Sequence, residues 1–201
     1  MTQQKRPIFP SEADRAAADA HAFRGRIYNS ILETIGATPL IRIGRMAERH
    51  DAKAEIAAKC EFFNPLSSVK DRIGLAMIEA AERDGRLRPG GVIVEGTAGN
   101  TGVGLALAAS IKGYRCIFTV PDKFSQEKIR LLRAFGAQVV VTPAAVAPDH
   151  PDYYLNVAQR IVEDTPNAIL ANQFYNPANP EAHYRTTGPE IWTQTEGRVT
   201  H

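Results

Sequence analysis

The sequence predicts an α/β protein with a parallel sheet, and two observations lead to that prediction. From about residue 38, short β-branched runs alternate with longer helical patterns, which is typical of βαβ units. One run is followed directly by a glycine-rich turn that opens an apolar helix, as at the carboxyl ends of strands in open α/β sheets. We therefore expect a sheet with helices packed on its faces.

The β-branched runs predict six strands: Leu40–Ile43, Glu55–Lys59, Val92–Glu95, Cys116–Val120, Val139–Thr142 and Ile169–Asn172. The periodic segments between them predict helices at 69–84, 100–112, 126–135, 153–164 and 180–194. In the first helix, Ile73, Met77 and Ala80 recur at helical spacing, and Gly85 follows as a stop. The helix 100–112 is apolar nearly all round, which predicts burial between layers.

Composition and charge disfavour several classes of protein. The chain has 44% apolar and 23% charged residues, as in an average globular protein. Its 24 Lys and Arg against 22 Asp and Glu give a net charge of +2, with no basic run that would suit nucleic acid. No apolar stretch approaches the ~20 residues of a membrane span, and residues 1–26 lack the apolar segment of a secretory signal. Cys60 and Cys116 stand in apolar surroundings, which favours buried reduced thiols in a cytoplasmic protein.

The segment NPLSSVKDR, residues 64–72, is the first candidate for chemistry. Ser68 precedes Asp71 by three residues, a variant of the capping box, and this places Lys70 in the first helical turn. There the positive end of the helix dipole and the neighbouring apolar stripe disfavour an ammonium group. Both effects favour the free amine that attacks carbonyl compounds. The alternative is an ordinary surface lysine near a helix end.

The segment EGTAGNTGVG, residues 95–104, is the second candidate. Its glycines remove side chains where a strand turns into a helix, so that backbone amides converge on an anion at the helix N-terminus. The spacing fits neither of the commonest nucleotide-binding loops, which favours a smaller anion such as a carboxylate. Thr97, Asn100 and Thr101 add hydrogen-bonding side chains at the same helix N-terminus, which we call the helix mouth. The alternative is a tight turn kept glycine-rich for packing, with Asn100 as the helix cap.

The sequence offers little support for other catalytic systems. It has no GxSxG segment, and neither cysteine lies in a loop beside a histidine. The five histidines are scattered without the spacing of metal ligands, so we expect no metal site.

Six ordered segments resemble cysteine synthases, the O-acetylserine sulfhydrylases, and the catalytic core of cystathionine β-synthase. They are IGATPLIRI (35–43), NPLSSVKDRIG (64–74), EGTAGNTGVGLA (95–106), SQEKIRLLRAFGAQVV (125–140), NQFYNPANPEAHY (172–184) and TGPEIW (187–192). The resemblance implies a fold-type-II pyridoxal-phosphate enzyme, related in fold to the tryptophan synthase β subunit. It implies a small four-stranded domain at 63–174, an incomplete larger domain at 37–62 and 175–201, and a leader at 1–36.

The resemblance also implies roles for individual residues. The lysine that matches Lys70 holds pyridoxal 5'-phosphate and later removes the α-proton of the substrate. Asn100 matches a residue that contacts the cofactor ring oxygen. The substrate carboxylate is held by residues that match Thr97, Ala98, Gly99, Thr101 and Gln173. The resemblance further implies an amino-acid substrate and a homodimer in the full-length form, without nucleic acid or membrane partners.

Two departures from the family qualify this prediction. Ala98 stands where many relatives carry serine, which removes one hydroxyl near the substrate. The chain ends at His201, before the glycine-rich loop and the serine that relatives use for the cofactor phosphate and the pyridine nitrogen. Losing about three charge-assisted hydrogen bonds of roughly 1.5–3 kcal/mol each predicts weak cofactor binding by this chain alone.

The function expected from the sequence is β-replacement that forms L-cysteine from O-acetylserine and sulfide. Cystathionine β-synthase or serine/threonine dehydratase activity is an alternative within the same fold. An alternative of another class is a non-catalytic module that docks on a full-length relative, but such a module would not need Lys70, Asn100 and Gln173 together.

Overall fold

The structure, a computed structural model, describes residues 26–97 and 99–200. These residues form two compact units. The parallel-sheet unit runs from Ser68 to Pro180. The discontinuous unit comprises the described residues up to Ser67 together with those from Glu181 on. The assignment of the units to a small and a larger catalytic domain stays a prediction.

The parallel-sheet unit contains four strands: β3 (Val92–Gly96), β4 (Arg115–Pro121), β5 (Gln138–Thr142) and β6 (Ala168–Leu170). They form one sheet in the order β5-β4-β3-β6, and every neighbouring pair is parallel. In the register, Val92 of β3 lies opposite both Arg115 and Ala168. Because the strands are parallel, their carboxyl ends share one edge of the sheet.

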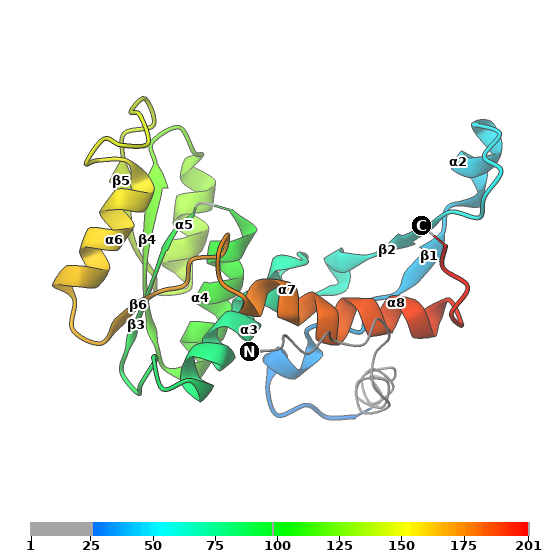
Figure 1. The fold of residues 1–201 in the computed structure, drawn as a ribbon, viewed down its shortest axis with the longest axis horizontal. Helices are drawn as coiled ribbons and strands as arrows, with labels where there is room; N and C mark the ends of the chain where they lie inside the picture. Colours follow the sequence, from blue (N-terminus) through cyan, green and yellow to red (C-terminus); the bar gives the residue numbers. More distant parts are fainter. Residues whose placement is uncertain (1–25, 98, 201) are drawn as a thin grey trace, which may run out of the picture. The chain divides into compact units, whose positions relative to one another are not determined.

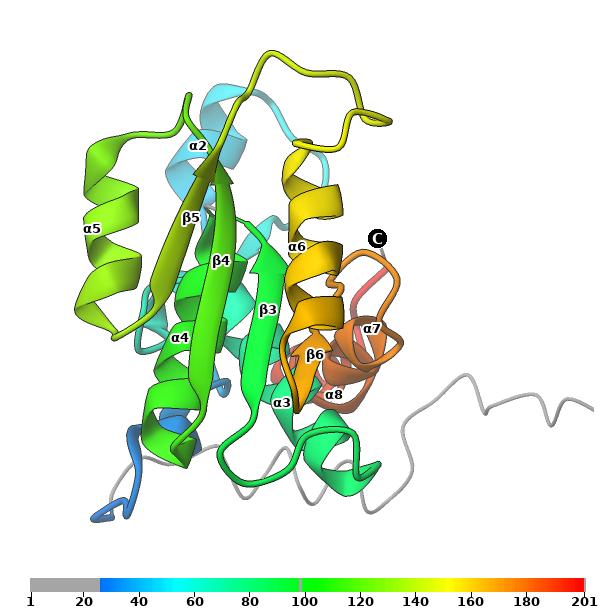
Figure 2. The same cartoon turned by 90° about the vertical axis from the view of Figure 1, so that its left-hand side faces the viewer.

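Helices cover both faces of this sheet, as Figures 1 and 2 show. They are α3 (Lys70–Arg83), α4 (Asn100–Lys112), α5 (Gln126–Ala134) and α6 (Tyr154–Asp164). On one face, α6 packs against Val92 and Val94 of β3 through Ala158. On the other face lie α4, α5 and α3, the last packed on α4 (Figure 1). This three-layer arrangement confirms the predicted α/β class with a parallel sheet.

The apolar patterns of α3 and α4 explain their positions. The predicted stripe of α3 is buried: Ile73 is 0% exposed and Met77 2% exposed. In α4, eight residues from Thr101 to Ala109 are buried, as expected for a helix that contacts both the sheet and α3. The helix α3 ends before Gly85, and α4 ends at Gly113, and both glycines have the positive φ that favours glycine at a helix stop.

The discontinuous unit is built on two short antiparallel strands, β1 (Leu40–Arg42) and β2 (Ala57–Lys59). Its helical segments are η1 (Ile31–Thr34), α2 (Gly44–Arg49), η2 (Glu61–Phe63), the π-helical turn η3 (His183–Thr187) and α8 (Gly188–Gln194). The short helix α7 (Ala178–Ala182) begins in the parallel-sheet unit and ends in this one.

Several predicted boundaries were wrong for local reasons. The strand expected at Glu55–Lys59 begins only at Ala57, and the strand expected to reach Asn172 ends at Leu170, since Asn172 has a positive φ of 54°. The helix expected at 180–194 contains the π-helical turn η3, where His183 Nδ1 lies 2.9 Å from Thr187 Oγ1. The sequence patterns also missed α2.

Other expectations concern burial and chain segments. Cys60 and Cys116 are free and buried, as predicted, and burial raises the pKa of the Cys116 thiol to about 12. Residues 1–25 of the predicted leader lie outside the described residues. Among the helices of residues 26–97 and 99–200, none combines the length and apolar character that a membrane crossing requires.

Candidate active site

The turn between β3 and α4 lies at the carboxyl edge of the parallel sheet. Thr97 is buried directly after β3, and its hydroxyl accepts a hydrogen bond of 3.2 Å from the backbone amide of Gly99. Gly99 occupies the N-cap position, and Asn100 is the exposed first residue of α4. The alternative prediction of Asn100 as the cap is therefore wrong, because Gly99 takes that place without a side chain. Ala98 lies outside the described residues.

Two glycines bring the two predicted motifs together. A Cβ atom on Gly104 of α4 would lie 2.7 Å from the carbonyl oxygen of Lys70, and one on Gly74 of α3 would lie 2.5 Å from the Gly104 carbonyl carbon. Only glycine permits such a close approach of two helix backbones. The first residue of α3 therefore packs beside the second turn of α4.

Lys70 lies in the first turn of α3, as the sequence predicted; it is the first residue of that helix and is partly buried. Its backbone amide donates a 3.1 Å hydrogen bond to the hydroxyl of Ser68, which satisfies one of the free N–H groups of the first turn. The segment before α3 therefore ends in a local side-chain hydrogen bond that sets where Lys70 stands.

Gln173 reaches the same helix mouth from the neighbouring strand β6. It lies three residues after β6, which pairs with β3, so the two strand ends are neighbours. The Thr101 hydroxyl donates a 2.6 Å hydrogen bond to Gln173 Oε1, across 72 positions of sequence. Thr97, Gly99, Thr101 and Gln173 are thus gathered at one edge, as expected of a joint site, while their roles in binding stay a prediction.

Glu95 is a site residue that the sequence patterns did not identify. It is the fourth residue of β3, and it is 2% exposed. Its Oε2 accepts a 2.6 Å hydrogen bond from the Asn172 backbone amide, and its Oε1 accepts a 3.3 Å hydrogen bond from Gln173 Nε2. An acidic residue inside the apolar run VIVEG, directly before the glycine turn, is the signal that could have revealed it.

Burial gives Glu95 unusual electrostatics. Desolvation raises the pKa of this carboxyl to about 6, and the hydrogen bonds from Asn172 and Gln173 offset part of that rise. Perturbed pKa values of this kind are common at functional sites, although buried structural groups also show them.

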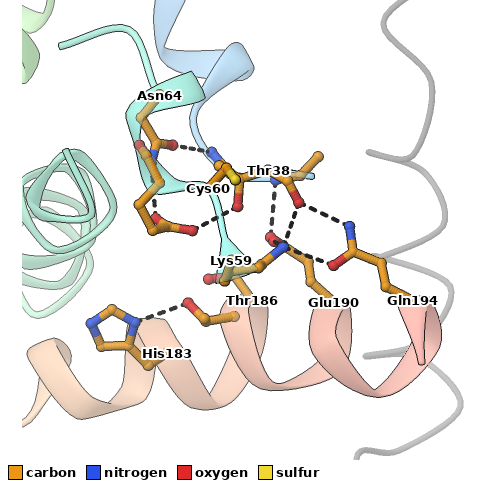
Figure 3. Close-up of polar contacts among 12 residues, drawn as sticks. Thr38, Lys59, Cys60, Asn64, His183, Thr186, Glu190 and Gln194 are labelled. Carbon is orange, nitrogen blue, oxygen red and sulfur yellow. Dashed lines mark hydrogen bonds and ion pairs between the residues drawn. The ribbon is translucent and has the colours of Figure 1, made fainter. Parts of the chain in front are cut away.

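A second, partly buried polar cluster lies in the discontinuous unit (Figure 3). Lys59 Nζ lies 2.6 Å from Glu190 Oε2, and it also donates to the carbonyl oxygen of Thr38 and to Gln194 Oε1 at 3.0 Å. The Gln194 amide donates back to the same Thr38 carbonyl at 2.8 Å. We call these four residues the Lys59–Glu190 cluster. It joins β2, α8 and the segment before β1 within this unit.

A comparison with known protein families identifies the family of the chain. Residues 31–201 match the sequence profile of the family described as pyridoxal-phosphate dependent enzyme. The chain belongs to this family. The resemblance inferred from the six segments is therefore confirmed, and with it the cofactor class.

Individual relatives are cysteine synthases and cystathionine β-synthases. The chain is 48% identical over 194 residues to cystathionine β-synthase of Oryctolagus cuniculus, covering 96% of the chain and 35% of that protein. It is 51% identical to cysteine synthase 1 of Emericella nidulans, covering 99% of the chain and 54% of that protein. The crystal structure of the cysteine synthase from Entamoeba histolytica matches with a TM-score of 0.80 and 42% identity, over 88% of the chain and 52% of that structure. The chain thus spans between about a third and about half the length of these relatives.

The described residues suit the cofactor in two respects. A primary amine on Lys70 can form a covalent bond to the aldehyde of pyridoxal phosphate. The exposed Asn100, the first residue of α4, adds a polar side chain at the N-terminal end of that helix. Within residues 26–97 and 99–200, no group of three or more His, Cys, Asp or Glu side chains is placed to hold a metal ion.

Proposed function

We propose that the protein performs β-replacement on a serine-type amino acid, forming L-cysteine from O-acetylserine and sulfide. The observation that carries this proposal is the packing of the Lys70 backbone beside the second turn of α4, the helix whose first turn carries the hydrogen bond between Thr101 and Gln173. The similarity to cysteine synthases supports the same reaction. Membership of the family establishes pyridoxal phosphate as the cofactor, whereas the identity of the substrate is proposed.

The helix mouth would bind the carboxylate of the substrate. Backbone amides at the start of α4 point toward the strand end, and the positive end of this 13-residue helix favours an anion there. The hydroxyl of Thr101 and the amide of Gln173 add polar groups at the same place. A substrate held by its carboxylate would have its Cα at a fixed distance from α3.

Lys70 and Asn100 would hold the cofactor. When bound, pyridoxal phosphate supplies an electron sink for the electron pair left at the substrate Cα. The Lys70 Nζ, once the substrate amine has displaced it from the cofactor, would take the proton from that Cα. The exposed Asn100 side chain, on the first turn of α4, would donate its amide to a polar atom of the cofactor ring.

A covalent-labelling experiment tests the role of Lys70. The protein is mixed with saturating pyridoxal phosphate, reduced with borohydride, digested and mapped, and we expect a pyridoxyl group on Lys70. The variant Lys70→Ala should lose the label, whereas Lys123→Ala, which removes an exposed lysine after β4, should keep it. Labelling spread evenly over exposed lysines would contradict the assignment.

The thiol that is used, if any, separates the three candidate reactions. Similarity to cystathionine β-synthases makes homocysteine the second candidate acceptor. Product formation from O-acetylserine with sulfide, from serine with homocysteine, and from either without a thiol would distinguish cysteine synthase, cystathionine β-synthase and dehydratase. The proposal includes a homodimer, which the molar mass in solution would test. A protein that binds neither cofactor nor amino acid but binds a full-length relative would instead support the docking module.

A further inference from the structure

We propose that Glu95 is a positioning residue that holds the side-chain amide of Gln173 in one of its two orientations. In that orientation the NH2 group faces Glu95 and the amide oxygen faces Thr101. The inference rests on the proposed function for the role of Gln173 in substrate binding, but the orientation itself is a property of this chain.

The hydrogen bonds give Glu95 the deciding position. The Ala171 backbone amide donates to the Val94 carbonyl at 2.9 Å, and the next amide, of Asn172, donates to the Glu95 side chain at 2.6 Å. The Glu95 carboxylate therefore ends the hydrogen bonding between β3 and the segment after β6. Its second oxygen then accepts from Gln173 Nε2 at 3.3 Å.

An ionised carboxylate can only accept hydrogen bonds, so it selects the NH2 end of the amide. The two ends of a glutamine amide have nearly the same shape, and only their partners distinguish them. Once Nε2 faces Glu95, Gln173 Oε1 must accept, and the Thr101 hydroxyl donates to it at 2.6 Å. The backbone of Gln173 is held separately, because Asn179 Nδ2 donates to its carbonyl oxygen at 2.8 Å.

The orientation of the amide controls what the helix mouth can offer to an anion. With Glu95 ionised, the Thr101 hydroxyl hydrogen is used by Gln173, while the second Nε2 hydrogen of Gln173 is free of Glu95. A protonated Glu95 can donate a hydrogen bond as well as accept one, so it can pair with either the oxygen or the NH2 group of the Gln173 amide. The reversed amide would donate to Thr101, and the hydrogen-bond donors at the mouth would be rearranged.

The charged and titratable groups around Glu95 are few. Among the described residues, its carboxyl accepts hydrogen bonds from neutral amides of the Asn172–Gln173 segment. From α6, Tyr154 faces this region, because a Cβ atom on Gly96 would lie 2.9 Å from a carbon atom of its ring. Burial raises the pKa of the Tyr154 phenol, Tyr153 adds to the rise, and so does the charge of Glu95. The raised pKa of Tyr154 keeps its phenol neutral at the pH where Glu95 titrates, so Glu95 is the group that changes charge.

Nuclear magnetic resonance of the side-chain amide of Gln173 tests the orientation without any enzyme activity. In protein labelled with 15N-glutamine, we expect the two Gln173 amide protons to shift with a midpoint near pH 6, following Glu95. In Glu95→Gln that shift should disappear, whereas the control Glu82→Gln, at a partly buried glutamate bonded to Lys112 and Tyr114, should retain it. A Gln173 signal that does not change between pH 4.5 and 7.5 in the unaltered protein would overturn the proposal, whether or not the variants fold.

Ligand affinity supplies the second readout. In the presence of pyridoxal phosphate at pH 7.5, we expect Glu95→Gln to bind O-acetyl-L-serine about tenfold more weakly than the unaltered protein, with Glu82→Gln unchanged. The shorter Glu95→Asp should recover part of the pH-dependent signal but not the affinity. Equal affinity in Glu95→Gln and the unaltered protein would refute the positioning role. If the unaltered protein binds no amino acid, the proposed function fails, and the Gln173 titration still decides the orientation.

Discussion

The two units each contain a buried glutamate, and the partners of these glutamates differ. Glu190 in the discontinuous unit is 7% exposed and forms an ion pair of 2.6 Å with Lys59. Glu95 in the parallel-sheet unit is 2% exposed and accepts hydrogen bonds from the neutral amides of Asn172 and Gln173. A similar degree of burial is therefore offset by a cation in one unit and by neutral hydrogen-bond donors in the other.

The cation explains the difference. A buried carboxylate beside an ammonium group keeps its charge, since the attraction offsets the cost of removing both ions from water. A buried carboxylate that meets only neutral donors gains less, and its pKa rises toward neutrality, as for Glu95. Glu190 thus serves as a fixed link between α8 and β2, whereas Glu95 can change charge near physiological pH at the edge of the candidate site.

Breaking the ion pair should have the largest effect on stability. We expect Lys59→Met to destabilise the discontinuous unit by about 3–5 kcal/mol, because Glu190 would be left buried without its cation. Trp192 is the only tryptophan of the chain and stands on α8, so its fluorescence during urea unfolding reports on this unit.

The double variant Lys59→Met with Glu190→Leu serves as the control. It should recover part of the loss, since replacing both partners leaves no buried charge. A single variant that unfolds at the same urea concentration as the unaltered protein would show that the ion pair contributes nothing.

Titrating Glu95 should have the next largest effect. Its pKa is raised from 4.5 to about 6, so the folded state binds the proton more tightly than the unfolded state. The stabilisation from Glu95 is complete below pH 4.5 and is lost as the pH rises through 6. A shift of this size corresponds to about 2 kcal/mol.

Hydrogen exchange of the β3 and β4 amides between pH 4.5 and 7 measures this effect, after correction for the intrinsic exchange rate. The difference in opening free energy between the unaltered protein and Glu95→Gln should change by about 2 kcal/mol across the range. Parallel pH profiles for the two proteins would mean that Glu95 has the same pKa folded and unfolded.

The group formed by Glu95, Thr101 and Gln173 and the Lys59–Glu190 cluster also differ in how far the sequence predicted them. Periodicity gave the four parallel strands and the helices that pack on them, because β-branched runs and apolar stripes are local signals. The packing of Gly74 on Gly104 explains why the segment with Lys70 meets the glycine turn, but it joins residues 30 positions apart and no local pattern records it. The resemblance to a family supplied what periodicity could not, namely the pairing of the turn with Gln173.

Buried polar groups were the residues that sequence patterns missed. Glu95, Lys59 and Glu190 are charged residues, and burial was not predicted for any of them. Glu95 meets the Asn172 amide across 77 positions of sequence, and Lys59 meets Glu190 across a still longer separation. Only the pairing of the elements shows which carboxylate meets a cation and which does not. The π-helical turn η3 was missed for a related reason, since a single wide turn leaves the helical pattern of residues 180–194 almost unchanged.

Removing single neutral hydrogen bonds should have the smallest effect on stability. It tests whether the hydrogen bonds of Gln194, beside the ion pair of Glu190, are independent of pH while those of Gln173, beside Glu95, are not. Gln194→Leu removes the bonds to Lys59 and Thr38 but leaves the ion pair, so we expect a loss of about 1 kcal/mol, seen in Trp192 fluorescence and unchanged from pH 5 to 7.

Thr101→Val should cost a similar amount in the parallel-sheet unit, but here the loss should vary with pH, because the Thr101 hydroxyl is coupled through Gln173 to Glu95. If the cost of Thr101→Val, measured by hydrogen exchange of β3, is the same at pH 5 and pH 7, the hydroxyl does not sense the charge of Glu95, and the two clusters differ only in the presence of Lys59.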